Sequence, residues 1–333
     1  MRFILFVAAL AALAGPVAAQ QAAATDPNCQ AAIAFSAARK GAAVLALRDG
    51  KPVCEGYAAS GAADHAMEIW SGTKSFSGLM AAAAVQDGLL TLDEPVSKTL
   101  PEWRDDPQKA KATIRQVLSL TSGLRSTVGQ PPTYAAAVTT PLSTPPGETF
   151  SYGPAPFQLF GEIMSRKLKA AGQPADPYLY LKRRILDPIG LTPGQWRRLP
   201  SGDALLPQGA VLTVREWVKF GELVRAGGVW NGKPLVDGVA FAELFKGSVA
   251  NPAYGVTFWL PNSSAAAGAG STDITRSPDL PRDLVLAAGA GNQRLFIIPS
   301  QKLVVARLAE FDGRPDGAGP TWSDAAFIRF FLH

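Results

Sequence analysis

The chain has 333 residues, of which 47% are hydrophobic, and a formal net charge of +5. This length and hydrophobic content support a large core and exclude a disordered chain. Lysine and arginine residues are scattered, and the one short basic run, at 166–169, fits a solvated helix face better than a nucleic-acid-binding patch. We therefore expect a globular protein without a nucleic-acid partner.

Residues 1–19 have the pattern of a cleavable export signal. Arg2 precedes an apolar run of roughly a dozen residues, and the segment ends in the small residues Val17-Ala18-Ala19. No later apolar run approaches the roughly 20 residues that are needed to span a bilayer. We expect a periplasmic or secreted protein without a membrane span, whose mature chain begins near Gln20.

A helix at 27–39 and a hairpin at 42–58 are the next predicted elements. The hairpin segment alternates around Asp49-Gly50, a dipeptide that is typical of tight turns. Cys29 and Cys54 lie in these two elements, and an oxidising compartment would allow them to form a disulfide. Two buried free thiols are the alternative, because the sequence does not give the distance between them.

An alanine-rich segment at 70–86 is apolar on every side, which predicts a buried helix. It nevertheless contains one charge, Lys74, three residues after Ser71. At this spacing the two side chains share one helix face, and burial lowers the pKa of a lysine, so that its neutral form can accept the serine proton. Ser71 also lies at the helix start, where the backbone dipole favours negative charge. We predict that Ser71 is a nucleophile activated by Lys74, with a simple helix cap as the alternative.

The residue inventory argues against most other catalytic arrangements. The two histidines are His65 and His333, and no G-x-S-x-G turn is present to hold the serine of a Ser-His-Asp triad. No His and Cys cluster has metal-ligand spacing, and neither a G-x-G-x-x-G nor a P-loop motif occurs. The chemistry is therefore expected to use no metal and no cofactor.

Three further motifs follow the Ser71-x-x-Lys74 pair along the chain. Residues 88–96 read GLLTLDEPV, residues 114–124 read IRQVLSLTSGL, and residues 145–154 read PPGETFSYGP. With these motifs the chain resembles the serine β-lactamase and penicillin-binding-protein superfamily, specifically its class C-like group, which includes the family VIII esterases. The resemblance implies that Ser71 is acylated and that Lys74 and Tyr152 move the protons. Which of the two is the base in each step stays open.

Two positions depart from the pattern of that family. Pro154 stands where the Tyr-x-Asn motif has its asparagine, and Ala287-Ala288-Gly289 stands where the third motif has Lys-Thr-Gly or His-Thr-Gly. Penicillins present a carboxylate that the lysine and threonine would bind, and each lost charge-assisted hydrogen bond removes about 1.5–3 kcal/mol. We therefore expect esters or small amides to be better substrates than β-lactams.

The resemblance also implies an oxyanion hole made by backbone groups. Its donors would be the N–H groups of Ser71 and Ala290, which side-chain substitution does not remove. Gly289 and Gln293 are candidates for lining the substrate cleft, with packing or strand-edge hydrogen bonding as the alternative role of Gln293. The Gly- and Pro-rich stretch 261–283 is predicted to be a surface loop that forms a lip of the cleft.

The C-terminal segments predict a second hairpin and a closing helix. The hairpin is RLFIIP followed by KLVVARLAE, and the helix lies within 321–333, where Phe327, Phe330 and Phe331 form a packing stripe. We expect an α/β fold of the α+β type, with an antiparallel sheet formed by both termini and flanked by helices, and an inserted lobe that is mostly helical.

The predicted division is one domain, 20–333, with two lobes. Residues 20–70 and about 240–333 would form the α/β lobe, and about 75–235 the helical lobe. The function that the sequence favours is an exported serine hydrolase with a small ester, amide or peptide as substrate. The alternatives are a D-alanyl carboxypeptidase or β-lactamase, and a non-catalytic sensor of wall peptides or β-lactams. No oligomeric state is predicted.

Overall fold

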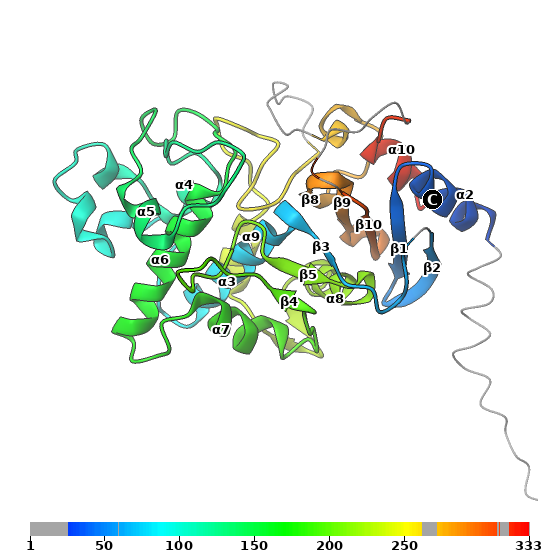
Figure 1. Ribbon diagram of the computed structural model, residues 1–333, viewed down its shortest axis with the longest axis horizontal. Coiled ribbons are helices and arrows are strands. Elements are labelled where there is room, and N and C mark those ends of the chain that lie inside the picture. The colour runs from blue at the N-terminus through cyan, green and yellow to red at the C-terminus, as the bar shows by residue number, and fades with distance from the viewer. Residues whose placement is uncertain (1–25, 59, 262–271, 312, 314–319, 333) are drawn as a thin grey trace, which may run out of the picture.

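The computed structural model describes residues 26–58, 60–261, 272–311, 313 and 320–332. A sheet that carries the N-terminal and C-terminal segments lies beside a mostly helical region (Figure 1). The predicted export signal and the centre of the predicted cleft lip, 262–271, lie outside the described residues.

The main sheet has five antiparallel strands in the order β2-β1-β10-β9-β8. They are β1 (Gly41–Arg48), β2 (Lys51–Tyr57), β8 (Val285–Gly289), β9 (Gln293–Ile298) and β10 (Leu303–Ala309). The first hairpin turns at Asp49 and Gly50, which both have positive φ, at 51° and 73°, as a tight primed turn requires. The two hairpins meet where β1 pairs with β10, which confirms the prediction that both termini build one antiparallel sheet.

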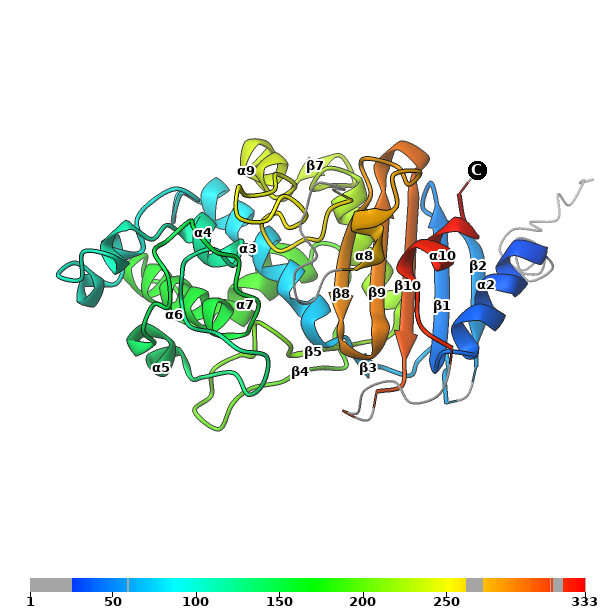
Figure 2. The same cartoon turned by 90° about the horizontal axis from the view of Figure 1, so that it is seen from above.

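Helices cover both faces of this sheet, so its central strands β1, β9 and β10 are almost entirely buried, and most of their residues are apolar. Helices α2 (Pro27–Ala37) and α10 (Asp324–Arg329) lie over one face, and α8 (Val214–Arg225) lies on the other (Figure 2). Cys29 of α2 forms a disulfide with Cys54 of β2. Phe327 and Phe331 are buried, whereas Phe330 is half-buried against Phe35.

The position of α8 differs from the predicted division of the lobes. Its residues fall within 75–235, yet the helix packs against β1, β9 and β10. A Cβ atom on Gly221 would lie 2.5 Å from Cγ1 of Val304, so a glycine allows the close approach of helix and sheet. The α/β lobe therefore includes α8, although this helix comes from the middle of the chain.

The helical region surrounds α3 (Lys74–Gln86), which runs through its centre (Figure 2). All residues of α3 from Lys74 to Ala84 are buried, as a segment that is apolar on every side predicts. The other helices there are α4 (Ile114–Leu118), α5 (Tyr134–Thr139), α6 (Ala155–Ala170), α7 (Pro177–Leu181) and α9 (Gly238–Glu243).

Short elements complete the described chain. Strands β3 (Met67–Glu68), β5 (Ala210–Leu212) and β4 (Gln195–Trp196) form a small sheet, and β6 (Val229–Trp230) pairs with β7 (Lys233–Pro234). Single 3₁₀ turns lie at Trp70–Thr73, Val96–Lys98, Pro101–Trp103, Lys109–Lys111, Asp273–Arg276, Ala290–Asn292 and Pro299–Gln301, and a π turn at Lys182–Leu186.

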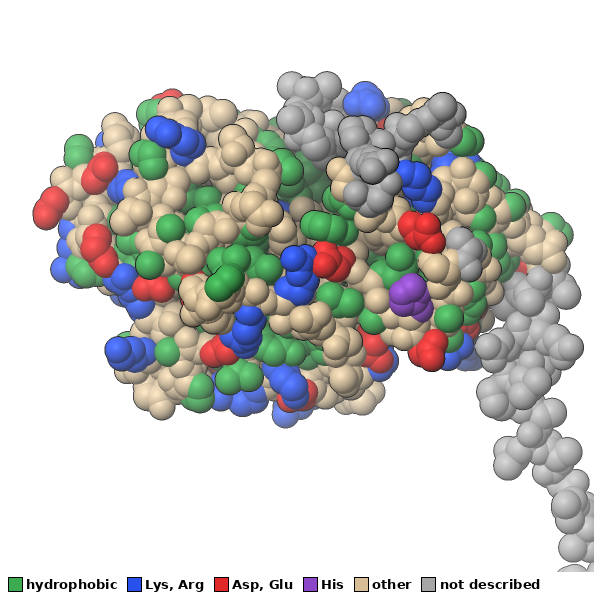
Figure 3. Space-filling view, in the orientation of Figure 1, with side chains coloured by type: hydrophobic (Ala, Val, Ile, Leu, Met, Phe, Trp, Pro, Cys, Tyr) green, Lys and Arg blue, Asp and Glu red, His purple; other side chains and the backbone are tan. Residues whose placement is uncertain are grey.

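The surface mixes charges of both signs. On the face shown in Figure 3, Lys and Arg side chains are interspersed with Asp and Glu side chains. Within the described part of the chain, the helices are too short or too polar for any of them to cross a membrane.

Candidate active site

Ser71 and Lys74 lie where the 3₁₀ turn Trp70–Thr73 leads into α3. Lys74 Nζ lies 2.8 Å from Ser71 Oγ and 3.1 Å from the carbonyl oxygen of Pro207. Ser71 is half-buried, which leaves it accessible, whereas Lys74 is only 3% exposed. The helix begins at Lys74 rather than at the predicted residue 70, so Ser71 precedes the regular helix.

Burial lowers the pKa of Lys74 from 10.5 to about 7. Its ammonium group faces aromatic rings, with Nζ 5.0 Å from the ring centre of Tyr152 and 5.3 Å from that of Phe157. These rings give a charged amine only a modest cation–π attraction, on the order of 1–2 kcal/mol. At neutral pH a large fraction of Lys74 is therefore uncharged and able to accept a proton from Ser71.

Tyr152 reaches the same serine from the loop before α6. Its hydroxyl is hydrogen-bonded to Ser71, and burial raises its pKa, although that hydrogen bond and the charge of Arg294 oppose the rise. The ring stacks on Trp259, with centres 5.8 Å apart and planes at 26°, and meets the ring of Tyr254 edge-on. Tyr152 is thus a rigidly held neutral phenol, which suits a proton donor.

The backbone just before Ser71 is strained. Trp70 has φ of +48°, in the left-handed region that bulky side chains rarely adopt. Hydrogen bonds on both sides hold this conformation, since Ile69 N–H donates to Ala210 O and Gly72 N–H donates to Ile69 O. Strain of this kind, about 1–3 kcal/mol, gathers at functional sites.

The end of β8 approaches the same segment closely. A Cβ atom on Gly289 would lie 2.0 Å from the carbonyl oxygen of Ile69, so a glycine is required at this point. β8 packs against the 3₁₀ turn that contains Ser71, and Ala290 follows as an exposed residue. The structure thus brings together Ser71, Lys74, Tyr152 and the backbone at 289–290, which is the set predicted from the sequence apart from Gln293.

Gln293 does not line this site, and its prediction as a substrate-binding residue is wrong. The side chain is 1% exposed and lies against β10, where it donates to Ala309 O at 2.6 Å and accepts from Ala309 N–H at 2.9 Å. The side-chain amide of Gln293 thus pairs with both the N–H and the C=O of Ala309. This is strand-edge hydrogen bonding, which was the alternative role given for Gln293.

Two contributors to the site were missed from the sequence. The first is the carbonyl of Pro207, which accepts a hydrogen bond from Lys74, and the second is the ring of Trp259. A backbone carbonyl has no residue-type signature, so no sequence signal could have indicated it. Trp259, which stacks on Tyr152, lies in an aromatic stretch, Tyr254 to Trp259, that could have indicated a packed wall.

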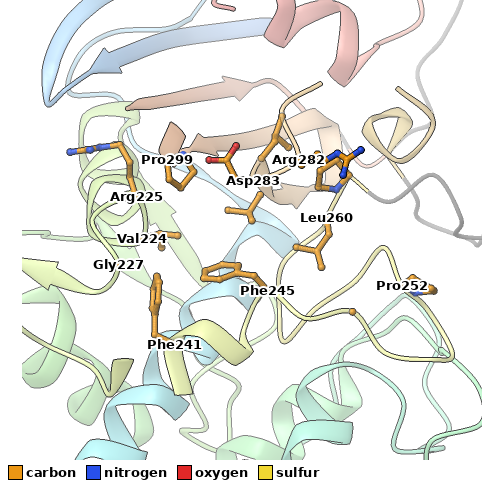
Figure 4. A pocket seen from close by; sticks show the side chains of 14 residues that line it. Val224, Arg225, Gly227, Phe241, Phe245, Pro252, Leu260, Arg282, Asp283 and Pro299 are labelled. Carbon is orange, nitrogen blue, oxygen red and sulfur yellow. The ribbon is translucent and has the colours of Figure 1, made fainter. Parts of the chain in front are cut away.

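A cavity of about 470 Å³ lies elsewhere, between α8, α9 and the start of β8 (Figure 4). Its walls include Val224, Phe241, Phe245 and Val285, and Val285 is at the opposite end of β8 from Gly289. Ser71, Lys74 and Tyr152 are not among the lining residues, so this cavity is separate from the candidate nucleophile.

Among curated proteins, Protein flp of Staphylococcus aureus (strain NCTC 8325 / PS 47) is 31% identical to this chain over 115 residues. The match covers 31% of this chain and 23% of that protein, so it spans less than a quarter of the relative's length.

Two solved structures have the same fold at low sequence identity. A putative β-lactamase from Bacteroides dorei DSM 17855 superposes with a TM-score of 0.72 at 18% identity, covering 92% of this chain and 97% of that one. A family VIII carboxylesterase superposes with a TM-score of 0.68 at 13% identity, covering 91% and 96%.

The profile of the Beta-lactamase family matches residues 19–327, which include every residue of the site described above. Because that match extends over most of the sequence, this chain belongs to the β-lactamase family, whose fold is typical of serine hydrolases.

Proposed function

We propose that this protein is an exported serine hydrolase that cleaves esters or small amides through an acyl-enzyme on Ser71. One observation carries the proposal: a buried lysine with a pKa near 7 lies 2.8 Å from the serine oxygen, and the Tyr152 hydroxyl is hydrogen-bonded to that same serine. A nucleophile, a base and a proton donor that meet at one accessible point are the parts that acyl transfer needs.

In the first half-reaction, neutral Lys74 takes the proton of Ser71 as Oγ bonds to the substrate carbonyl carbon. The carbonyl oxygen becomes an oxyanion, which the backbone N–H groups of Ser71 and Ala290 stabilise. The intermediate then expels the alcohol or amine, which receives a proton from Tyr152, and the Lys74 ammonium restores the phenol. Water repeats the sequence on the acyl-enzyme and releases the acid.

The walls of the site favour esters and small amides over β-lactams. At the position of the third motif the chain has Ala287, which is 1% exposed, and the half-buried Ala288, so neither side chain offers a cation or a hydroxyl to a penicillin carboxylate. Arg294, on the adjacent strand β9, is nearly buried and already pairs with Asp324.

Export is supported by the disulfide between Cys29 and Cys54, because such bonds persist in oxidising compartments. Expressing the full chain and measuring the mass of the protein in the periplasmic or secreted fraction tests this part. A mature protein that begins near residue 20 is expected, and an unprocessed chain confined to the cytosol would contradict export.

The catalytic proposal is tested by comparing the mature protein with two alanine variants. Ser71→Ala removes the nucleophile, and Ser77→Ala is its matched control, because Ser77 is a buried serine of α3 whose hydroxyl has no hydrogen-bond partner among the described residues. With p-nitrophenyl butyrate as substrate, Ser77→Ala should retain activity, and Ser71→Ala should lose at least about a thousandfold in kcat. Circular dichroism checks that both variants fold.

The other outcomes separate the alternatives. Equal activity of the two variants would contradict the role of Ser71. Faster turnover of nitrocefin or of a D-alanyl-D-alanine peptide than of esters would identify a β-lactamase or carboxypeptidase. An inactive wild type that binds wall peptides saturably would identify a sensor.

A further inference from the structure

We propose that Arg294 is a positioning residue for the oxyanion hole, because its guanidinium holds the peptide that joins Gly289 to Ala290. The inference rests on the proposed function, in which the N–H of Ala290 stabilises the oxyanion. It assigns this arginine a role in the reaction, although its side chain is almost enclosed by protein and need not touch the substrate.

The contacts of Arg294 tie together both ends of the turn between β8 and β9. Nη1 donates to the carbonyl of Gly289 at 2.9 Å and to that of Gln293 at 3.0 Å, and Nη2 donates to Oδ1 of Asn292 at 3.1 Å. The turn contains Gly291 and Asn292, both with positive φ, at 69° and 60°. Asparagine adopts this region more readily than most residues, and the hydrogen bond from Arg294 to the Asn292 side chain helps to hold the turn.

The hydrogen bond to Gly289 also sets the direction of the donor that the reaction needs. In a trans peptide, the C=O of one residue and the N–H of the next point in opposite directions from one rigid plane. No cis peptide bond occurs in the described chain. Anchoring the Gly289 oxygen therefore anchors the Ala290 N–H on the other side. A charged donor on that oxygen also polarises the peptide, which strengthens its N–H as a donor.

A buried carboxylate fixes the arginine itself. Nε of Arg294 donates to Oδ1 of Asp324 at 2.5 Å, and Asp324 is 2% exposed. The same oxygen accepts from Nε1 of Trp322 at 2.6 Å. Asp324 begins α10, so the C-terminal helix supports the peptide of the oxyanion hole through Arg294. An arginine held in this way is unavailable as a flexible receptor for a substrate carboxylate.

Two changes test the role, because removing Arg294 alone would leave Asp324 buried and unpaired. The double variant Arg294→Met/Asp324→Asn removes both charges and keeps the acceptor for Trp322, and Arg294→Lys keeps a charge that can reach the Gly289 carbonyl. The matched control is Arg225→Met/Glu222→Gln, which removes an arginine–carboxylate pair of α8 outside the site. The probes are p-nitrophenyl butyrate and propylboronic acid, whose serine adduct mimics the tetrahedral intermediate.

The expected result for Arg294→Met/Asp324→Asn is a fall in kcat of about 10- to 100-fold, less than the loss of a whole oxyanion donor. KM should stay within about threefold, and the inhibition constant of propylboronic acid should rise in proportion to the loss of kcat. Arg294→Lys should restore part of the activity, and the α8 control should leave all three values within about twofold.

A folded Arg294→Met/Asp324→Asn variant with unchanged kcat and unchanged boronate inhibition would overturn the inference. If the wild type hydrolyses neither esters nor small amides, the proposed function fails, and the positional claim is then judged by a crystal structure of the same variant. A rotated Gly289–Ala290 peptide in that structure supports the role of Arg294, and an unmoved peptide refutes it.

Discussion

Replacing Lys74 with methionine should make the protein more stable and inactive at the same time. Methionine fills a similar volume without a charge, so it removes both the base and the cost of burying an ammonium group. The pKa of Lys74 falls from 10.5 to about 7 on folding. At about 1.36 kcal/mol for each pKa unit, the buried charge destabilises the folded state by about 5 kcal/mol at most.

The sign and pH window of the effect follow from the lowered pKa. Below pH 7 the lysine is protonated in both the folded and the unfolded state, so folding bears the full cost of burial. Between pH 7 and 10.5 the folded protein releases the proton, and the cost declines until it vanishes. Methionine should therefore stabilise the protein most at pH 6, and by about 3 kcal/mol less at pH 9. That difference does not depend on how well methionine packs or on the lost hydrogen bonds to Ser71 and Pro207.

Urea unfolding of the wild type and of Lys74→Met at pH 6 and pH 9 measures this difference. In the wild type, kcat/KM should also rise with pH through an apparent pKa of about 7, the value for Lys74. The same difference in unfolding free energy at both pH values would refute the reasoning, because Lys74 would then have an ordinary pKa and could not serve as a base at neutral pH.

Three further substitutions have expected outcomes. Tyr152→Phe keeps the stacked ring but removes the hydroxyl, so kcat/KM should fall about 10²- to 10⁴-fold while Tm changes little; an unchanged rate would remove Tyr152 from proton transfer. Gly289→Ala places a methyl group 2.0 Å from the Ile69 carbonyl, and kinetics should show a loss of at least about a hundredfold, whereas full activity would argue against the close approach of β8. Removing the disulfide with Cys29→Ala/Cys54→Ala should lower the unfolding free energy by about 3 kcal/mol in urea titrations and leave kcat unchanged, and equal stability would show that the crosslink contributes little.

The hairpins and the buried helix could be predicted because their signals are local. Asp49-Gly50 adopts the positive φ values of a tight turn, and the apolar run after Ser71 becomes the buried α3. The position of α8 could not be predicted in this way. An amphipathic helix indicates that one of its faces is buried, but not whether a sheet or another helix covers that face.

The candidate site was predictable where side-chain type determines the chemistry, as for Ser71 and Lys74. It was not predictable where the partner is a backbone atom, as for the Pro207 carbonyl, or where a contact joins distant segments, as for Arg294 with Asp324. Gln293 shows the same limit, because a polar residue beside a motif can equally face the neighbouring strand, and here its amide pairs with Ala309.

The central claim is that Ser71 carries the acyl group. It is tested most directly by mixing the mature protein with p-nitrophenyl butyrate, quenching in acid within one turnover, and measuring the mass of the protein and of its peptides. The account predicts that one butyryl group is added, that it lies on Ser71, and that it is absent from Ser71→Ala. A wild-type enzyme that turns over the ester with the butyryl group on another residue, or an equally labelled Ser71→Ala variant, would contradict the account.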